Sequence, residues 1–167
     1  MSAQVTVHRM TTTTTTTAVL LNIGYLKTLP GILKLFQIVL GIVAVAITGH
    51  YIKWDSSYYE SMVPELFFLL VATTCLITTT LLLLSCLCSI ATASIIPKTL
   101  FETLYHIVAS LLYLSAGLCF IIYLNSEQNR RYVTNYGPKT AAAAIGLVNT
   151  ALYFLACFYS VRSYRRG

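Results

Sequence analysis

Long apolar stretches, separated by short groups of charged residues, dominate the chain. The longest segment without a charged residue covers 32 positions, from Leu66 to Pro97. A helix needs about 20 mostly apolar residues to cross the roughly 30 Å hydrocarbon core of a bilayer. The pattern predicts four such helices, at about residues 32–52, 64–88, 104–124 and 141–161. Because the connections between them are short, we expect consecutive helices to be antiparallel neighbours.

The same pattern argues against membrane-spanning strands. Strands of a transmembrane barrel alternate apolar and polar residues. Residues 81–84 are all leucine and residues 141–144 are all alanine, so neither segment alternates. The sequence therefore predicts an all-α membrane protein built as a bundle of four transmembrane helices.

Composition excludes the soluble classes. Hydrophobic residues make up 57% of the 167 positions and charged residues 10%, and the mean hydropathy is +0.75. A soluble domain carries about 25% charged residues, and a disordered chain combines low hydrophobicity with high charge. We therefore predict an integral multi-pass protein of the plasma membrane or a vesicle membrane, with membrane lipids as its first partners.

Basic residues at the ends of the spans predict the orientation. Seven basic residues fall on the side of the two termini and four on the opposite side. The first group is Arg9, Lys27, Lys34, Lys98, Arg162, Arg165 and Arg166, and the second is Lys53, Arg130, Arg131 and Lys139. Since cytoplasmic flanks carry the excess of positive charge, both termini are predicted to be cytoplasmic.

The chain divides into a tail, a membrane domain and a short basic end. Residues 1–23 are predicted to be a disordered cytoplasmic tail, which includes seven consecutive threonines at Thr11 to Thr17. This run is interpreted as a solvated linker or, alternatively, as a phosphorylation cluster. Residues 24–162 form the membrane domain, in which Thr28 is expected to cap the first span ahead of Pro30. Residues 163–167 form a short basic cytoplasmic tail.

Four polar residues of the spans are candidates for a contact between helices: Lys34, Gln37, Glu102 and His106. Glu102 and His106 are four residues apart and therefore share one helix face. Lys34 and Gln37 occupy the same leaflet on the first span. We interpret the group as an inter-helix polar contact near the membrane interface. The alternative is a proton or ion path in a small channel or proton-coupled transporter, because ionisable groups inside a membrane are often functional.

The five cysteines all fall within predicted spans, so a disulfide across the outer loops is excluded. Cys86 and Cys88 lie near the cytoplasmic end of the second span and are therefore candidates for palmitoylation. The alternative is that both are small packing residues. No other ligands gather around them, so no metal site is expected.

Small residues in the spans allow helices to approach closely. Gly41 in the first span and the pair Ala142 and Gly146 in the fourth are candidate helix-packing positions. They serve packing within the monomer or, alternatively, association into a homo-oligomer or with other membrane proteins.

Motifs of catalysis are missing from the sequence. The chain contains no HExxH motif and no glycine-rich phosphate loop. We therefore expect a non-enzymatic protein without catalytic residues, cofactor or small-molecule substrate. The net charge of +6 comes from the membrane flanks, so no nucleic-acid partner is expected.

Two segments resemble a known family. Residues 24–41, GYLKTLPGILKLFQIVLG, are similar to the opening of a MARVEL domain of the chemokine-like-factor-like (CMTM) and MAL groups. Residues 101–117, FETLYHIVASLLYLSAG, are similar to the third helix of that family, and the resemblance extends over about residues 24–162. It implies a four-helix membrane module without catalysis, used in vesicle trafficking, membrane apposition, cell junctions or cell fusion. A stabilising subunit of a larger membrane complex is a further alternative.

Overall fold

The computed structural model describes residues 22–52, 59–126 and 135–166, with the side chains of 59–62 left out. The predicted tail with its Thr11 to Thr17 run lies outside the described residues, apart from its last two positions. So do three of the basic residues counted on the side opposite the termini: Lys53, Arg130 and Arg131.

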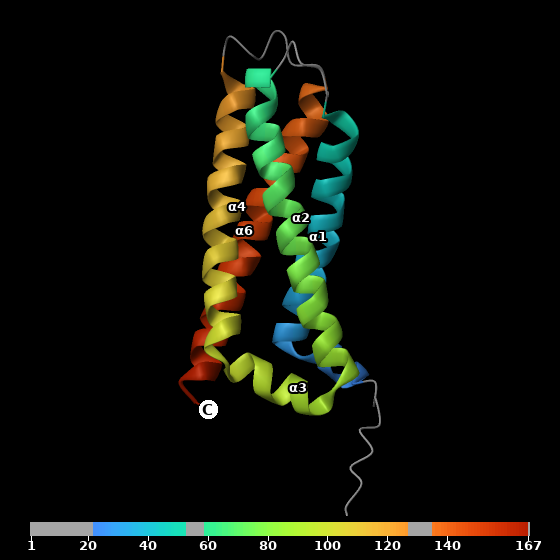
Figure 1. Ribbon diagram of the computed structural model, residues 1–167, viewed down its shortest axis with the longest axis vertical. Helices are drawn as coiled ribbons and strands as arrows, with labels where there is room; N and C mark the ends of the chain where they lie inside the picture. Colours follow the sequence, from blue (N-terminus) through green and yellow to red (C-terminus); the bar gives the residue numbers. More distant parts are fainter. Residues whose placement is uncertain (1–21, 53–58, 127–134, 167) are drawn as a thin grey trace, which may run out of the picture.

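Four long helices run side by side in an antiparallel bundle (Figure 1). The elements are η1 (Ile23–Lys27), α1 (Leu29–Tyr51), α2 (Tyr59–Cys88), α3 (Ile90–Ile95), η3 (Ile96–Lys98), α4 (Leu100–Asn125) and α6 (Tyr136–Tyr164). α1, most of α2, α4 and α6 are each long and apolar enough to cross a bilayer. The described residues form helices and turns, without strands. The predicted all-α, four-span fold class is confirmed.

The short helix α3 lies across one end of the bundle, beside the beginning of α1 and the C-terminus (Figure 1). We call this the α3 end, and the other the opposite end. A small loop was predicted between the second and third spans, but the structure forms this connection from α3 and η3. Ser89 begins α3 by accepting a hydrogen bond from the Thr92 N–H at 3.2 Å.

The start of α1 is fixed by local chemistry. The Thr28 hydroxyl accepts a hydrogen bond from the Gly31 N–H at 3.3 Å, as the cap prediction requires. Pro30 stands at a position where the missing N–H has no intrahelical partner. A Cβ at Gly31 would lie 2.1 Å from the Tyr25 carbonyl oxygen, so only glycine fits. This close approach places η1, and with it Tyr25, against the bundle.

Three helices, α2, α4 and α6, begin four or five residues before the predicted spans. α2 begins at Tyr59 and passes through Pro64, and α6 begins at Tyr136. Pro64 lies inside α2 and removes one backbone hydrogen bond, yet the helix continues through it to Cys88. Glu65 consequently lies inside a continuous helix.

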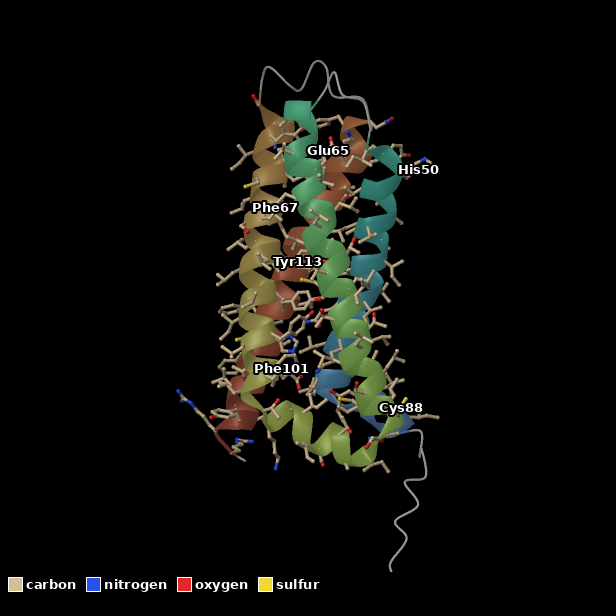
Figure 2. The ribbon with its side chains drawn as sticks, in the orientation of Figure 1. His50, Glu65, Phe67, Cys88, Phe101 and Tyr113 are labelled. Atoms are coloured by element: carbon tan, nitrogen blue, oxygen red, sulfur yellow. The ribbon has the colours of Figure 1, made fainter. Side chains whose placement is uncertain are left out.

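Aromatic rings fill the middle of the bundle. Phe68, Tyr113, Phe120 and Tyr153 are each 0% exposed. The ring centroids of Phe68 and Phe120 are 5.3 Å apart, and those of Tyr113 and Tyr153 are 5.4 Å apart. Figure 2 shows Tyr113 among the helices, whereas Phe101 lies at the outer surface, where it is 63% exposed. An aromatic core and an apolar exterior suit a bundle surrounded by lipid.

Candidate functional site

The most polar part of the interior is a cluster formed by Lys34, Glu102 and His106 near the α3 end. These side chains come from α1 and α4 and are 1%, 2% and 1% exposed. The Lys34 ammonium donates a hydrogen bond to Glu102 Oε1 within a buried ion pair. His106 Nε2 lies 3.4 Å from the same carboxylate oxygen. The cluster therefore ties α1 to α4 through one carboxylate.

Tyr25 extends this cluster from η1. The Lys34 ammonium also donates to the Tyr25 hydroxyl at 3.2 Å, and Tyr25 packs with Leu83 and Cys86. Burial raises the pKa of the Tyr25 phenol above its ordinary value, so the phenol keeps its proton at neutral pH. Lys34 thus has two partners inside the protein, and its side chain does not extend to the lipid headgroups.

Gln37 is buried one turn along α1 but makes a different contact. Its side chain is 1% exposed, and no hydrogen-bond partner for its amide lies within the described residues. Its backbone carbonyl accepts a hydrogen bond from Asn149 Nδ2 of α6 at 3.4 Å. Of the four polar candidates, the structure therefore brings Lys34, Glu102 and His106 together, whereas Gln37 contacts α6 through its backbone.

Three hydroxyl groups tie α2, α4 and α6 together in the middle of the bundle. The Thr79 hydroxyl lies 2.7 Å from the Tyr105 hydroxyl and 2.7 Å from the Tyr153 hydroxyl. Tyr105 also donates to the Cys75 carbonyl at 3.0 Å. The contacts among these three hydroxyl groups were not predicted, because one hydroxyl per helix leaves no motif along the chain.

A second buried ion pair lies toward the opposite end. Lys139 of α6 donates to Glu65 Oε1 of α2, and the two residues are 5% and 4% exposed. This pair was not predicted, because Lys139 was counted as a flanking charge and Glu65 stands at the beginning of the predicted span 64–88. The available signal was the pair of opposite charges at the outer ends of the predicted second and fourth spans.

The three small residues singled out for packing all lie inside the bundle. Gly146 is covered by Phe68, because a Cβ there would lie 2.4 Å from Phe68 Cε2. Gly41 has more room, since its Cβ would lie 3.4 Å from the nearest atom, Leu76 Cδ1. Ala142 is 0% exposed. Gly146 thus leaves the space on α6 that the Phe68 ring of α2 occupies.

The five cysteines are free. Cys86 is 0% exposed and packs beside Tyr25, whereas Cys88 is exposed at the end of α2 (Figure 2). Among the described residues, no three His, Cys, Asp or Glu side chains gather as metal ligands would.

We propose that Cys88 is the palmitoylated residue of the two, because an acyl transferase can reach its thiol without unpacking η1. Acyl-exchange labelling should fall to background in Cys88→Ser and stay at the wild-type level in Cys86→Ser. Labelling that persists in Cys88→Ser, or no labelling of the wild type, would contradict this assignment.

A small cavity adjoins the Lys34 cluster at the α3 end. Its volume is about 20 Å³, and its lining includes Lys34, Glu102 and His106 together with Pro97, Ala156 and Ser160. The cavity thus lies where the beginnings of α1 and α4 meet the end of α6. Ser160 is held there by a hydrogen bond of 2.8 Å with Thr103.

Comparison with known proteins agrees with the helical architecture. Residues 25–159 match the family model MARVEL, described as a membrane-associating domain. No curated protein and no solved structure is significantly similar to the chain. The family match covers α1, α2, α4, most of α6 and the buried polar cluster. The chain is a multi-pass membrane protein that belongs to the MARVEL family.

Proposed function

We propose that the protein is a non-enzymatic organiser of membranes, acting through lateral contacts with lipids and other membrane proteins. Its role lies in vesicle trafficking, membrane apposition, cell junctions or cell fusion. Membership of a membrane-associating family supports this proposal.

One observation carries the proposal: charge is paired inside the spans while the sides of the bundle are apolar. The two ion pairs bury Lys34 with Glu102 and Lys139 with Glu65. On the outside, Leu111, Ile122 and Phe154 are 60%, 67% and 68% exposed. Within the membrane, such a surface offers packing against acyl chains or apolar helices as its main interaction.

The alternative is proton-coupled transport through the polar interior. Polar groups extend from the Lys34 cluster to the hydroxyl groups of Thr79, Tyr105 and Tyr153. These groups form hydrogen bonds and ion pairs mainly with one another, which favours a structural role in holding the helices together. A flux measurement separates the two functions and is described in the Discussion.

We further propose that the α3 end faces the cytoplasm. Lys98 and three arginines of the α6 end (Arg162, Arg165, Arg166) are exposed there, in line with the charge bias of cytoplasmic flanks. Lys34 on the side of the termini and Lys139 on the opposite side each form a buried ion pair. Leaving both out of the count of basic residues removes one from each side, so the excess on the side of the termini remains.

Labelling of single cysteines tests this orientation. Single cysteines are placed at Ser57, Gln128 and the two tails of a cysteine-less variant, and an impermeant reagent should label intact cells only at Ser57 and Gln128. Labelled tails would reverse the orientation.

Isolation in native lipid tests the organiser function. The full-length protein is extracted from its own membrane in polymer-bounded nanodiscs, and the co-isolated lipids and proteins are compared with the bulk membrane. Two variants alter the exterior alone: Phe154→Ala with Phe158→Ala on α6, and Leu118→Ala with Ile122→Ala on α4, all at exposed positions. We expect a reproducible enrichment that one of the two variants removes. Discs with the composition of the bulk membrane would contradict the proposal.

A further inference from the structure

Exposed charge at the α3 end is of one sign. Five basic side chains are exposed there: Lys27, Lys98, Arg162, Arg165 and Arg166. Glu102, the acidic side chain that the structure describes at this end, is buried and paired with Lys34. None of the five exposed basic side chains forms an ion pair with a described residue. The α3 end therefore presents positive charge that the described part of the protein does not neutralise.

The fold brings these charges together from three parts of the chain. The cavity at the α3 end is lined by Pro30 of α1, Pro97 of η3 and Ser163 of α6, among others. Lys98 directly follows Pro97, Arg162 directly precedes Ser163, and Lys27 stands three residues before Pro30. Each of the three segments that meet at this cavity thus carries a basic residue beside it.

Apolar neighbours indicate the depth of these charges in the membrane. Leu29 follows Lys27 by two residues, and Leu100 and Phe101 follow Lys98 by two and three residues. All three apolar side chains are exposed, and Figure 2 shows Phe101 at the outer surface. Such residues at helix ends mark the border between hydrocarbon and headgroups, and long basic side chains extend from there to the headgroups. The basic side chains consequently lie at the level of the lipid phosphates.

The opposite end differs in its balance of charge. In the sequence, Lys53 is accompanied by Asp55 and Glu60, and Arg130 and Arg131 are accompanied by Glu127. Lys139 is paired with Glu65 inside the bundle. Basic and acidic residues are therefore equal in number on that side, and the positive excess belongs to the α3 end.

We propose that the α3 end binds the anionic headgroups of phospholipids through Lys98, Arg162, Arg165 and Arg166, assisted by Lys27. Basic residues at the membrane surface attract anionic lipids, and a guanidinium can donate two parallel hydrogen bonds to one phosphate. This inference rests on the organiser function and deepens it by naming the class of lipid. It can fail alone, because the nanodisc variants change the apolar sides of the bundle, whereas the test below changes its charged end.

Electron paramagnetic resonance of spin-labelled lipids measures the preference. The full-length protein is reconstituted in phosphatidylcholine vesicles with a trace of chain-labelled phosphatidylserine, phosphatidylglycerol or phosphatidylcholine, and the motionally restricted fraction gives the association constant of each lipid. We expect both anionic lipids to associate about twofold more strongly than phosphatidylcholine, averaged over all lipid positions around the protein. The preference should disappear in about 1 M salt, where the Debye length is about 3 Å. No preference in the wild type, or one limited to phosphatidylserine, would overturn recognition by charge.

Neutral variants locate the preference at one end of the bundle. The α3-end variant is Lys98→Gln with Arg162→Gln, Arg165→Gln and Arg166→Gln, and the control is Lys53→Gln with Arg130→Gln and Arg131→Gln. The preference should be lost in the first and retained in the second. Replacing the same three α6 arginines by lysine should also retain it, since the charge remains. Arg165→Gln with Arg166→Gln serves instead if the α3-end variant does not fold, and should lower the preference.

Two results would contradict the site. One is a preference that survives in the folded α3-end variant, and the other is a preference that the control removes equally. If the wild type shows no preference while native nanodiscs keep their enrichment, the headgroup site is rejected and the organiser function stands.

Discussion

Glu102→Leu is expected to destabilise the protein by about 3 kcal/mol, the lower end of the range for breaking a buried ion pair. The reason is that Lys34, only 1% exposed, loses its carboxylate while staying inside the bundle. An interhelical hydrogen bond in a membrane averages only about 0.6 kcal/mol, so the loss is dominated by the unpaired charge. The free energy of unfolding in mixed detergent micelles measures this effect.

A double variant provides the control for Glu102→Leu. Removing both charges, in Lys34→Met with Glu102→Leu, should recover most of the lost stability, because an apolar pair of similar volume replaces a buried ion pair at little cost. Glu102→Gln keeps the shape of the side chain and should fall between the wild type and Glu102→Leu. If the double variant is as unstable as Glu102→Leu, the unpaired charge is not the cause.

Gly146→Ala is expected to cost about 1–3 kcal/mol, the range for overpacking a core. The added Cβ would meet the Phe68 ring at 2.4 Å, and that ring is 0% exposed, so it has little space to move. Phe120 and Tyr113 confine it further, with ring centroids 5.3 and 6.4 Å from that of Phe68. The midpoint of thermal unfolding in detergent should fall accordingly.

Gly41→Ala is the matched control, because both glycines lie in long helices. The new Cβ would lie at ordinary contact distance from Leu76, at 3.4 Å. A helix gains about 0.5–1 kcal/mol when alanine replaces an interior glycine, so this variant should be neutral or slightly stabilised. If Gly41→Ala and Gly146→Ala lower the stability equally, contact with Phe68 is not the reason for the loss at Gly146.

The spans were predictable because lipid imposes a simple rule on sequence. A charge-free length near 20 residues identifies a helix that crosses the bilayer, and the fold class follows from four such segments. Helix ends were less predictable. Pro64 and Glu65 look like a helix start in sequence, but the helix begins at Tyr59 and continues through Pro64.

The polar interior was predictable only where spacing along one helix reveals it. Glu102 and His106 are four residues apart and thus stand on one face. The contacts among Thr79, Tyr105 and Tyr153 depend on the rotation of three helices, which no local pattern encodes. Lys139 and Glu65 are 74 residues apart, and each resembles an ordinary charge at a membrane interface.

A measurement of proton flux tests most directly whether the buried polar groups only hold the helices together, as the organiser function requires. Purified wild-type protein and Glu102→Gln are reconstituted in liposomes that carry an internal pH indicator, and a pH gradient is applied. The account predicts that the wild type and the variant both dissipate the gradient no faster than protein-free liposomes. Flux in the wild type that disappears in folded Glu102→Gln would contradict the account and identify the protein as a proton transporter.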